Sequence, residues 1–328
     1  MDKVYLGVDV GSISINFVLI NENRHVLFQS YIRGAGDPVQ TVQQALKEFS
    51  GFMADFPDRQ ISGVCTTGSG RELIGLLLGA DLVKNEISAH ARAALHLYPE
   101  VQTIIEVGGQ DSKVAILRDG LVVDFAMNLV CAAGTGSFLD SQSRRLNVSI
   151  EDFGALAMES ENPASIAGRC TVFAESDMIH KQQIGFLQKD IIMGLCIALA
   201  RNYVSNVCRG KELRPPCLFQ GGVSANPGMR RAFEAILGYP VIVPEYHMVM
   251  GAYGAAILAM EACGELSAPA SGAQTRFRGY DIRDMDIHSS GFNCRDCSNE
   301  CTIMQIWNKD RVLNCSGGRC EKWNTTIY

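Results

Sequence analysis

Asp9-Val10-Gly11-Ser12-Ile13-Ser14 and Val107-Gly108-Gly109-Gln110-Asp111-Ser112-Lys113 are the two stretches that decide the fold of this chain. Each is an acidic, glycine-containing turn that follows a short apolar strand pattern, Val4–Val10 in the first case and Gln102–Val107 in the second. Each turn leads into a second strand, a hairpin turn and a third strand. The repeated order of elements predicts a duplicated α/β architecture with the two turns at equivalent positions.

The first turn has the chemistry of a phosphate site. Backbone N–H groups of small residues can approach a phosphate, and a carboxylate at a strand end can hold a hydrated Mg²⁺ ion. A turn of this kind is more often only a turn, so its repetition carries the inference. The predicted contacts are Asp9 through water to Mg²⁺ and Gly11, Ser12, Ile13 and Ser14 to phosphate.

The second turn adds catalytic side chains to the same arrangement. Gly108 and Gly109 repeat the close backbone approach. Gln110 and Asp111 could orient or activate a water, and Lys113 could offset phosphate charge. We therefore predict Gln110 and Asp111 as the catalytic residues.

A third glycine cluster follows the strand pattern Cys217–Phe219. Gly221 and Gly222 let the backbone pass close to a flat ligand such as adenine, with Val223 and Asn226 beside it. The helix that starts next favours anions at its N-terminus. An ordinary strand-to-helix loop is an equally good interpretation of this cluster alone.

Twelve cysteines distinguish the chain from an ordinary phosphotransferase. The chain is long and 47% hydrophobic, without a secretory signal, so its thiols are expected to be reduced in the cytoplasm and available to metals. Cys131 stands just ahead of the turn Gly134-Thr135-Gly136, and Cys170 stands at the next comparable position. A thiol at a helix start favours an electron-poor metal centre. Cysteines expected to be packed core residues are Cys65, Cys196, Cys208, Cys217 and Cys263.

Two thiols per chain cannot complete a four-thiolate cluster, but two chains related by a twofold axis can. The formal net charge of -6 argues against a nucleic-acid-binding surface, and no segment is apolar for long enough to span a membrane.

Five motifs in order give the chain a family resemblance: DVGSISIN (9–16), EVGGQDSK (106–113), CAAGTGSFLD (131–140), CTVFAESD (170–177) and GGVSAN (221–226). It resembles the ATP-dependent activators of 2-hydroxyacyl-CoA dehydratases and the ATPase subunits of benzoyl-CoA reductases. The resemblance implies the acetate and sugar kinase, chaperone and actin fold, and a homodimer bridged by one [4Fe–4S] cluster on Cys131 and Cys170. It further implies a Mg-ATP or Mg-ADP site, with Gly134, Thr135 and Gly136 at its edge.

This family resemblance predicts subdomains at residues 1–98 with 247–264 and at 99–246, with the nucleotide in the cleft between them. It implies an ATP-hydrolysing reductase that passes single low-potential electrons from ferredoxin or flavodoxin to an acceptor iron–sulfur protein, a dehydratase or a reductase. Two alternatives stay open: a small-molecule kinase with Asp111 as base, and a nucleotide-gated scaffold with structural thiols. Many relatives have Lys where this chain has Asn16, so a phosphate contact at that position is in question.

Residues 265–328 form a cysteine-rich extension beyond the family pattern. Its thiols predict a second iron–sulfur cluster or, as the alternative, a Zn²⁺ site, with short helices between the ligands. Unligated reduced thiols are the third interpretation. The five cysteines are Cys294, Cys297, Cys301, Cys315 and Cys320.

Glu86 and His90 lie four residues apart on a predicted helix. With no other ligand nearby in sequence, we expect a solvated pair rather than a metal site.

Overall fold

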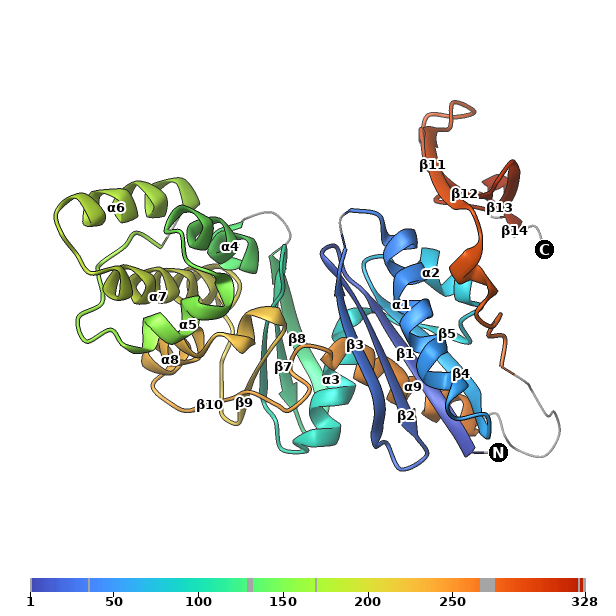
Figure 1. The fold of residues 1–328 in the computed structure, drawn as a ribbon, viewed down its shortest axis with the longest axis horizontal. Helices are drawn as coiled ribbons and strands as arrows, with labels where there is room; N and C mark the ends of the chain where they lie inside the picture. Colours follow the sequence, from blue (N-terminus) through green and yellow to red (C-terminus); the bar gives the residue numbers. More distant parts are fainter. Residues whose placement is uncertain are drawn as a thin grey trace.

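The computed structural model describes residues 2–34, 36–128, 132–168, 170–265, 275–323 and 325–326. They form two lobes, each built on a five-stranded sheet, and a smaller four-stranded sheet. Figure 1 shows the first lobe and the small sheet on one side, the second lobe on the other, and helices α3 and α9 between the two large sheets.

The first lobe has the strand order β3-β2-β1-β4-β5. β1 pairs antiparallel with β2 and parallel with β4. Alternate β1 residues face opposite sides, because side chains alternate along a strand. Leu6 belongs to the core under α1 and α2, whereas Tyr5 belongs to the core with α9. The elements are β1 (Asp2–Val10), β2 (Ser14–Asn21), β3 (Val26–Arg33), α1 (Pro38–Ala54), β4 (Arg59–Gly68), α2 (Arg71–Leu78) and β5 (Leu82–Val83).

The second lobe repeats this topology in the order β8-β7-β6-β9-β10. β6 pairs antiparallel with β7 and parallel with β9, as β1 does with β2 and β4. The duplicated α/β architecture is therefore confirmed. The elements are β6 (Thr103–Val107), β7 (Ser112–Arg118), β8 (Leu121–Asn128), α4 (Gly136–Arg145), α5 (Ile150–Met158), α6 (Thr171–Gln183), α7 (Gln188–Asn206), β9 (Cys217–Gln220), α8 (Pro227–Leu237) and β10 (Val241–Ile242).

Helices α3 (Glu86–Leu97) and α9 (Met250–Glu265) join the lobes. Their alanine-rich faces share one core with side chains from both large sheets. α9 crosses β1 so closely that a Cβ added at Gly7 would lie 1.9 Å from the Ala252 carbonyl oxygen. The lobes are thus connected by tightly packed helices beneath the cleft.

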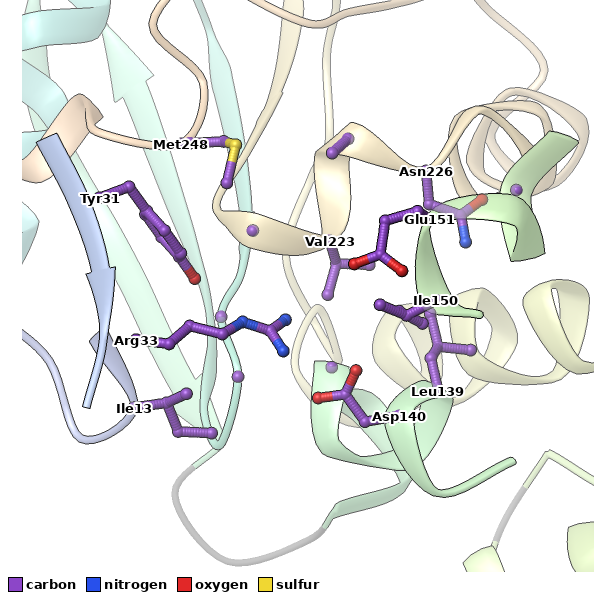
Figure 2. A pocket seen from close by; sticks show the side chains of 16 residues that line it. Ile13, Tyr31, Arg33, Leu139, Asp140, Ile150, Glu151, Val223, Asn226 and Met248 are labelled. Carbon is purple, nitrogen blue, oxygen red and sulfur yellow. The ribbon is translucent and has the colours of Figure 1, made fainter. Parts of the chain in front are cut away.

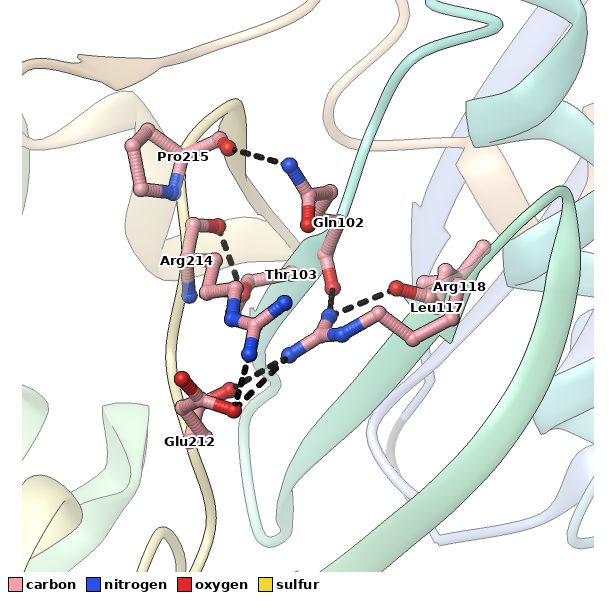
Figure 3. Close-up of polar contacts among 7 residues, drawn as sticks. All are labelled: Gln102, Thr103, Leu117, Arg118, Glu212, Arg214 and Pro215. Carbon is pink, nitrogen blue, oxygen red and sulfur yellow. Dashed lines mark hydrogen bonds and ion pairs between the residues drawn. The ribbon is translucent and has the colours of Figure 1, made fainter.

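A polar network clamps the chain segment that leads into β9, the strand before the third glycine cluster (Figure 3). Arg118 donates to the carbonyl of Glu212 at 3.0 Å, and the Thr103 hydroxyl donates to the carbonyl of Arg214 at 2.9 Å. Gln102 donates to the Pro215 carbonyl at 2.8 Å. These bonds fix residues 212–215 against β6 and β7.

The cysteine-rich extension forms the third sheet, not the short helices that we expected between its thiols. Its strands contain β-branched and aromatic residues, which favour strands. The strands are β11 (Ile287–Asn293), β12 (Thr302–Asn308), β13 (Arg311–Ser316) and β14 (Thr325–Thr326), with single 3₁₀ turns at Asp281–Asp284 and Glu321–Trp323.

Predicted core cysteines behave as expected. Cys65, Cys196, Cys208 and Cys217 are buried, and Cys263 is half-buried. Burial raises the pKa of Cys196 to about 12, so it stays a neutral thiol. No helix in the described part of the chain combines the length and apolarity that crossing a bilayer requires.

Candidate functional site

The two acidic turns face each other across the cleft between the lobes. A Cβ added at Gly109, in the second turn, would lie 2.5 Å from Cδ1 of Ile13 in the first turn. The Gly11 N–H donates to the Ser14 carbonyl at 2.9 Å, which closes the first turn, and the Gly108 N–H donates to the Asp111 carbonyl at 3.0 Å. The strand ends of two lobes thereby bring two turns almost 100 residues apart in sequence into contact.

Asp9 is set at the base of this cleft. Its carboxylate lies against two glycines, because a Cβ at Gly68 would be 2.5 Å from Oδ1 and one at Gly251 would be 2.2 Å from Oδ2. Burial raises the pKa of Asp9 to about 7, an effect that nearby Lys113 opposes. A larger residue at either glycine would displace the carboxylate.

Lys113 is the centre of the charge cluster. Its Nζ lies 2.8 Å from Glu106, 2.9 Å from Asp111 and 3.1 Å from Glu86. Burial lowers the pKa of Lys113, but the three carboxylates raise it more, so the ammonium stays charged. Lys113 therefore neutralises carboxylates in addition to lying near the predicted phosphate position.

Glu86 and His90 are not the solvated pair that we expected. Glu86 joins the Lys113 cluster, and His90 is buried, with Nδ1 2.7 Å from Nε2 of Gln220. Burial lowers the pKa of His90 to about 4, so the imidazole is neutral at physiological pH. The sequence spacing gave no sign of this, because the partners Lys113 and Gln220 come from the other lobe. The contact between Glu106 and Lys113 could have been predicted from the sequence, because the two residues are cross-strand partners in the β6–β7 hairpin.

Two adjoining cavities, of about 330 and 70 Å³, form a continuous cleft. The smaller holds the charged groups, and the larger is lined by apolar side chains such as Leu139 and Ile150 with Asp140 and Glu151. Figure 2 shows the larger cavity, with Arg33 reaching in from the first lobe toward the second. The cleft therefore offers a polar end and an apolar end, as a nucleotide requires.

Most of the predicted nucleotide contacts line this cleft. Gly136 lines it too, whereas Gly134 and Thr135 are buried beneath it. The lining residues are Asp9, Gly11, Ser12, Ile13, Ser14, Gly108, Gly109, Gln110, Asp111, Lys113, Gly221, Gly222, Val223 and Asn226.

Two orphaned polar atoms leave the cleft with unmet hydrogen bonds that a nucleotide and a water on its Mg²⁺ could satisfy. Among the described residues, Oδ1 of Asn16 and Nδ2 of Asn226 are buried without a hydrogen-bond partner, and each residue lines one of the two cavities. Buried polar groups ordinarily have partners. Asn16 could accept from a water on Mg²⁺ and Asn226 could donate to the nucleoside.

Cys170 is the N-cap residue of α6, and its side chain makes no capping hydrogen bond. The thiol is partly exposed, and next to it Val172 and Phe173 are 66% and 65% exposed. Cys170 lines a small hollow together with Ala133, which follows the other predicted ligand by two positions. Cys131 itself lies outside the described residues.

The start of α4 links the nucleotide cleft to this hollow. Gly136 N–H donates to the Gly108 carbonyl at 2.9 Å and Ser137 N–H donates to the Gly109 carbonyl at 2.8 Å. One turn earlier, the 3₁₀ turn Ala132–Gly134 carries Ala133 into the Cys170 hollow. The second acidic turn and the thiol site thus share one rigid connection.

Two lobes of equal topology, each giving a glycine turn to one cleft, define a nucleotide-binding protein of the duplicated actin-like class. The chain belongs to the BadF/BadG/BcrA/BcrD ATPase family, which it matches over residues 6–259.

Two relatives and one solved structure confirm the predicted family and fold. The 2-hydroxyisocaproyl-CoA dehydratase activator of Clostridioides difficile is 33% identical over 261 residues, 79% of this chain and 96% of that protein. The activator of lactoyl-CoA dehydratase of Anaerotignum propionicum is 35% identical over 261 residues, 78% of this chain and 97% of that protein. The solved activator of the 2-hydroxyisocaproyl-CoA dehydratase from Clostridium difficile with bound ADPNP matches with a TM-score of 0.76 and 32% identity, covering 83% of this chain and 99% of that one.

Proposed function

We propose that this protein is a homodimeric ATPase that delivers low-potential single electrons to a partner iron–sulfur enzyme. One observation carries the proposal: the free thiol of Cys170 stands at a helix start beside exposed apolar side chains and is linked through α4 to the Gly108-Gly109 turn. A small-molecule kinase needs neither this thiol nor this linkage. Relatives named as dehydratase activators add support, because they too act on a partner enzyme.

In this proposal the cleft binds Mg-ATP across the two lobes. The carboxylate of Asp9 would hold Mg²⁺ through water. The N–H groups of Ser12, Ile13 and Gly109 would face phosphate oxygens, because those of Gly11 and Gly108 are already bonded within the turns. Asp111 accepts a hydrogen bond from the attacking water and Gln110 orients it. Lys113 keeps the neighbouring carboxylates from repelling the phosphates.

The fit of the core cluster rests on Cys170. The Cys170 thiol makes no capping hydrogen bond, so it could ligate a [4Fe–4S] cluster together with Cys131 and the same two cysteines of a second copy. That cluster would supply one-electron transfer. The exposed apolar side chains of α6 would be covered by the second copy. The predicted domain limits and the ferredoxin or flavodoxin donor belong to this proposal.

Nucleotide state would reach the thiols through α4. If closure of the cleft moves the Gly108-Gly109 turn, the first N–H groups of α4 move with it, because both are bonded to its carbonyls. The 3₁₀ turn before α4 then shifts against the Cys170 hollow. A change there would alter the surroundings of the cluster. The reduction potential of an iron–sulfur cluster depends on those surroundings.

The test is the Cys170→Ala variant, purified without oxygen. In wild type the core cluster should account for about four irons and four sulfides per two chains, beyond any that the cysteine-rich extension binds. The variant should lose them and lose electron delivery, yet bind Mg-ADP as wild type does. Cys196→Ala, which removes a buried thiol, is the matched control and should keep the iron. A variant at Cys170 that retains full iron content would refute the ligand assignment, and stoichiometric phosphate transfer to a metabolite would favour the kinase.

A further inference from the structure

The small sheet has two differently built ends. Near the first lobe, Ile287 and Ile306 join the core beneath α1, and Gln43 donates to the carbonyls of Ile282 at 2.9 Å and Met285 at 2.7 Å. Away from that lobe the sheet has only a minor core of its own, centred on Ile303. A core this small rarely holds a fold without a disulfide or a metal. Its buried members besides Ile303 are Cys294 and Cys315, with Cys301, Val312 and Trp323 packed against them.

Strand register places thiols on one face of this sheet. The Cys294 N–H donates to the Cys301 carbonyl at 2.8 Å, which continues the antiparallel β11–β12 pairing and sets these two residues opposite each other. Cys315 pairs with Gln305. Because side chains alternate along a strand, residues 301, 303 and 305 share a face, and their partners share it too. Three of the five thiols therefore lie on the face that carries Ile303.

The sulfur atoms already accept hydrogen bonds from N–H groups. Trp323 Nε1 donates to Sγ of Cys294 at 3.2 Å, and Gln305 Nε2 donates to Sγ of Cys315 at 3.5 Å. The ammonium of Lys322 donates to the carboxylate of Asp296, which also accepts a hydrogen bond from the Cys294 thiol at 3.3 Å. N–H donors and cations around sulfur stabilise thiolates, as they do around metal-bound cysteines.

The two remaining thiols lie in segments that adjoin the start of β12. Cys297 lies in the turn between β11 and β12, and Cys320 follows Gly317 and Gly318; both side chains are exposed. Gly317 has a φ of +101°, and a Cβ there would lie 2.4 Å from the Thr302 carbonyl, so the glycine brings this segment back against the start of β12. Within the described residues no three Cys, His, Asp or Glu side chains stand at ligand distance. Ligation therefore requires side-chain rotation at Cys297 and Cys320.

We propose that Cys294, Cys297, Cys301 and Cys320 form a tetrathiolate metal centre that closes the free end of the small sheet. The soft thiolate set suits Zn²⁺ or an iron–sulfur cluster, and either takes four such ligands. Cys315 stays outside the set because it pairs with Gln305, four positions further along β12 than Cys301. The proposal is independent of the bridging cluster between chains.

The experiment uses the full chain with Cys131→Ala and Cys170→Ala, so that the proposed bridging cluster does not contribute iron. Zinc, iron and sulfide are measured per chain after purification without oxygen. We expect either one zinc, or iron and sulfide in equal amounts with visible absorption; the first identifies a zinc site and the second a cluster. Adding Cys297→Ser should lower the metal content at least tenfold, whereas adding Cys315→Ser should leave it unchanged.

Tryptophan fluorescence gives a second readout. The chain has two tryptophans, Trp307 on β12 and Trp323 in the 3₁₀ turn before β14, and Trp323 donates to a proposed ligand. A chelator should change the emission of the parent protein and not that of its Cys297→Ser variant. A metal-free parent, or metal that depends on Cys315 and not on Cys297, would overturn the proposal.

Discussion

Asp9 and Lys113 show how the cleft holds opposite charges without solvent to screen them. Asp9 has a pKa near 7 because burial disfavours its charged form, while Lys113 keeps its charge through three carboxylates. Substitution of each residue should therefore change the stability of the folded protein in a different way.

For Asp9 the folded pKa is about 7 and the ordinary value is 3.8. The folded state holds a proton that the unfolded state releases, so stability is lost as pH rises from about 4 through 7. The Asp9→Asn variant has no titrating group at this position, so it does not lose this stability as pH rises. Its stability relative to wild type should increase on going from pH 5 to pH 8 by on the order of 3 kcal/mol, measured by urea unfolding. Mg-dependent nucleotide binding should be lost in the same variant. An equal stability difference at both pH values would contradict the assigned burial.

Lys113→Met should leave Glu86, Glu106 and Asp111 close together without their counter-charge. Removing one partner of a buried ionic cluster costs about 3–5 kcal/mol. The matched control is Lys211→Met, which breaks the 2.6 Å pair with Asp124, a side chain that is about half exposed. Water can reach Asp124 once its partner is removed, so this variant should lose less stability than Lys113→Met. The two variants are compared by their denaturation midpoints; equal losses would show that the Lys113 cluster is not effectively buried.

What could be predicted at this scale depended on distance along the chain. Asp9, Gly108 and Asp111 belong to local turns whose type can be read from adjacent residues. His90 contacts Gln220, which is 130 positions away, so no local pattern reveals the contact. Asn226 shows both behaviours. Its role as a helix cap, in which Oδ1 accepts from the Met229 N–H at 3.1 Å, can be predicted from adjacent residues, but its position in the cleft cannot.

Helix α6 is the element whose surroundings are incomplete in a single chain. Only Ala174 and Met178 of its residues are buried, whereas Val172, Phe173 and Ile179 are exposed. Exposed apolar patches of this kind mark interaction sites. In the proposed dimer the two copies of α6 flank the bridging cluster.

Phe173→Glu should therefore weaken the dimer. A charge placed in an apolar contact costs several kcal/mol, so the dissociation constant should rise at least tenfold, and cluster content should fall with it. Light scattering under anaerobic conditions measures the first and iron analysis the second. The control is Met158→Glu on α5, because Met158 is also an exposed apolar residue of the second lobe, 46% accessible. If both variants stay dimeric, α6 is not the interface.

Elements differed in how well their type could be predicted. β1 to β3 and β6 to β8 follow from apolar runs separated by turn residues. The extension is wrongly predicted from its ligand spacing, which favours short helices, although Thr302–Asn308 contains the β-branched and aromatic residues typical of a strand. α7 is buried over most of its surface, so its sequence lacks the polar face that would mark an amphipathic helix.

At the scale of the whole molecule, the extension is continuous with the first lobe. Ile306 and Ile303 lie three positions apart on β12 and both are fully buried, but Ile306 belongs to the first-lobe core and Ile303 to the minor core of the small sheet. Thr275 and Arg276 further bind Asp81, at 2.6 and 2.8 Å. The small sheet should therefore share its stability with the lobe at one end and unfold locally at the other.

Two isoleucine-to-alanine variants on β12 distinguish the end of the small sheet that shares the lobe core from the end that does not. Each removes comparable volume from a buried site and should cost about 2–5 kcal/mol where it acts. Ile306→Ala should speed amide exchange in both α1 and β12, because it weakens a core that the two share. Ile303→Ala should speed exchange in β12 and β13 and leave α1 as in wild type. Hydrogen exchange followed by mass spectrometry resolves these segments. Unchanged exchange in α1 with Ile306→Ala would mean that the extension is only tethered to the lobe and shares no core with it.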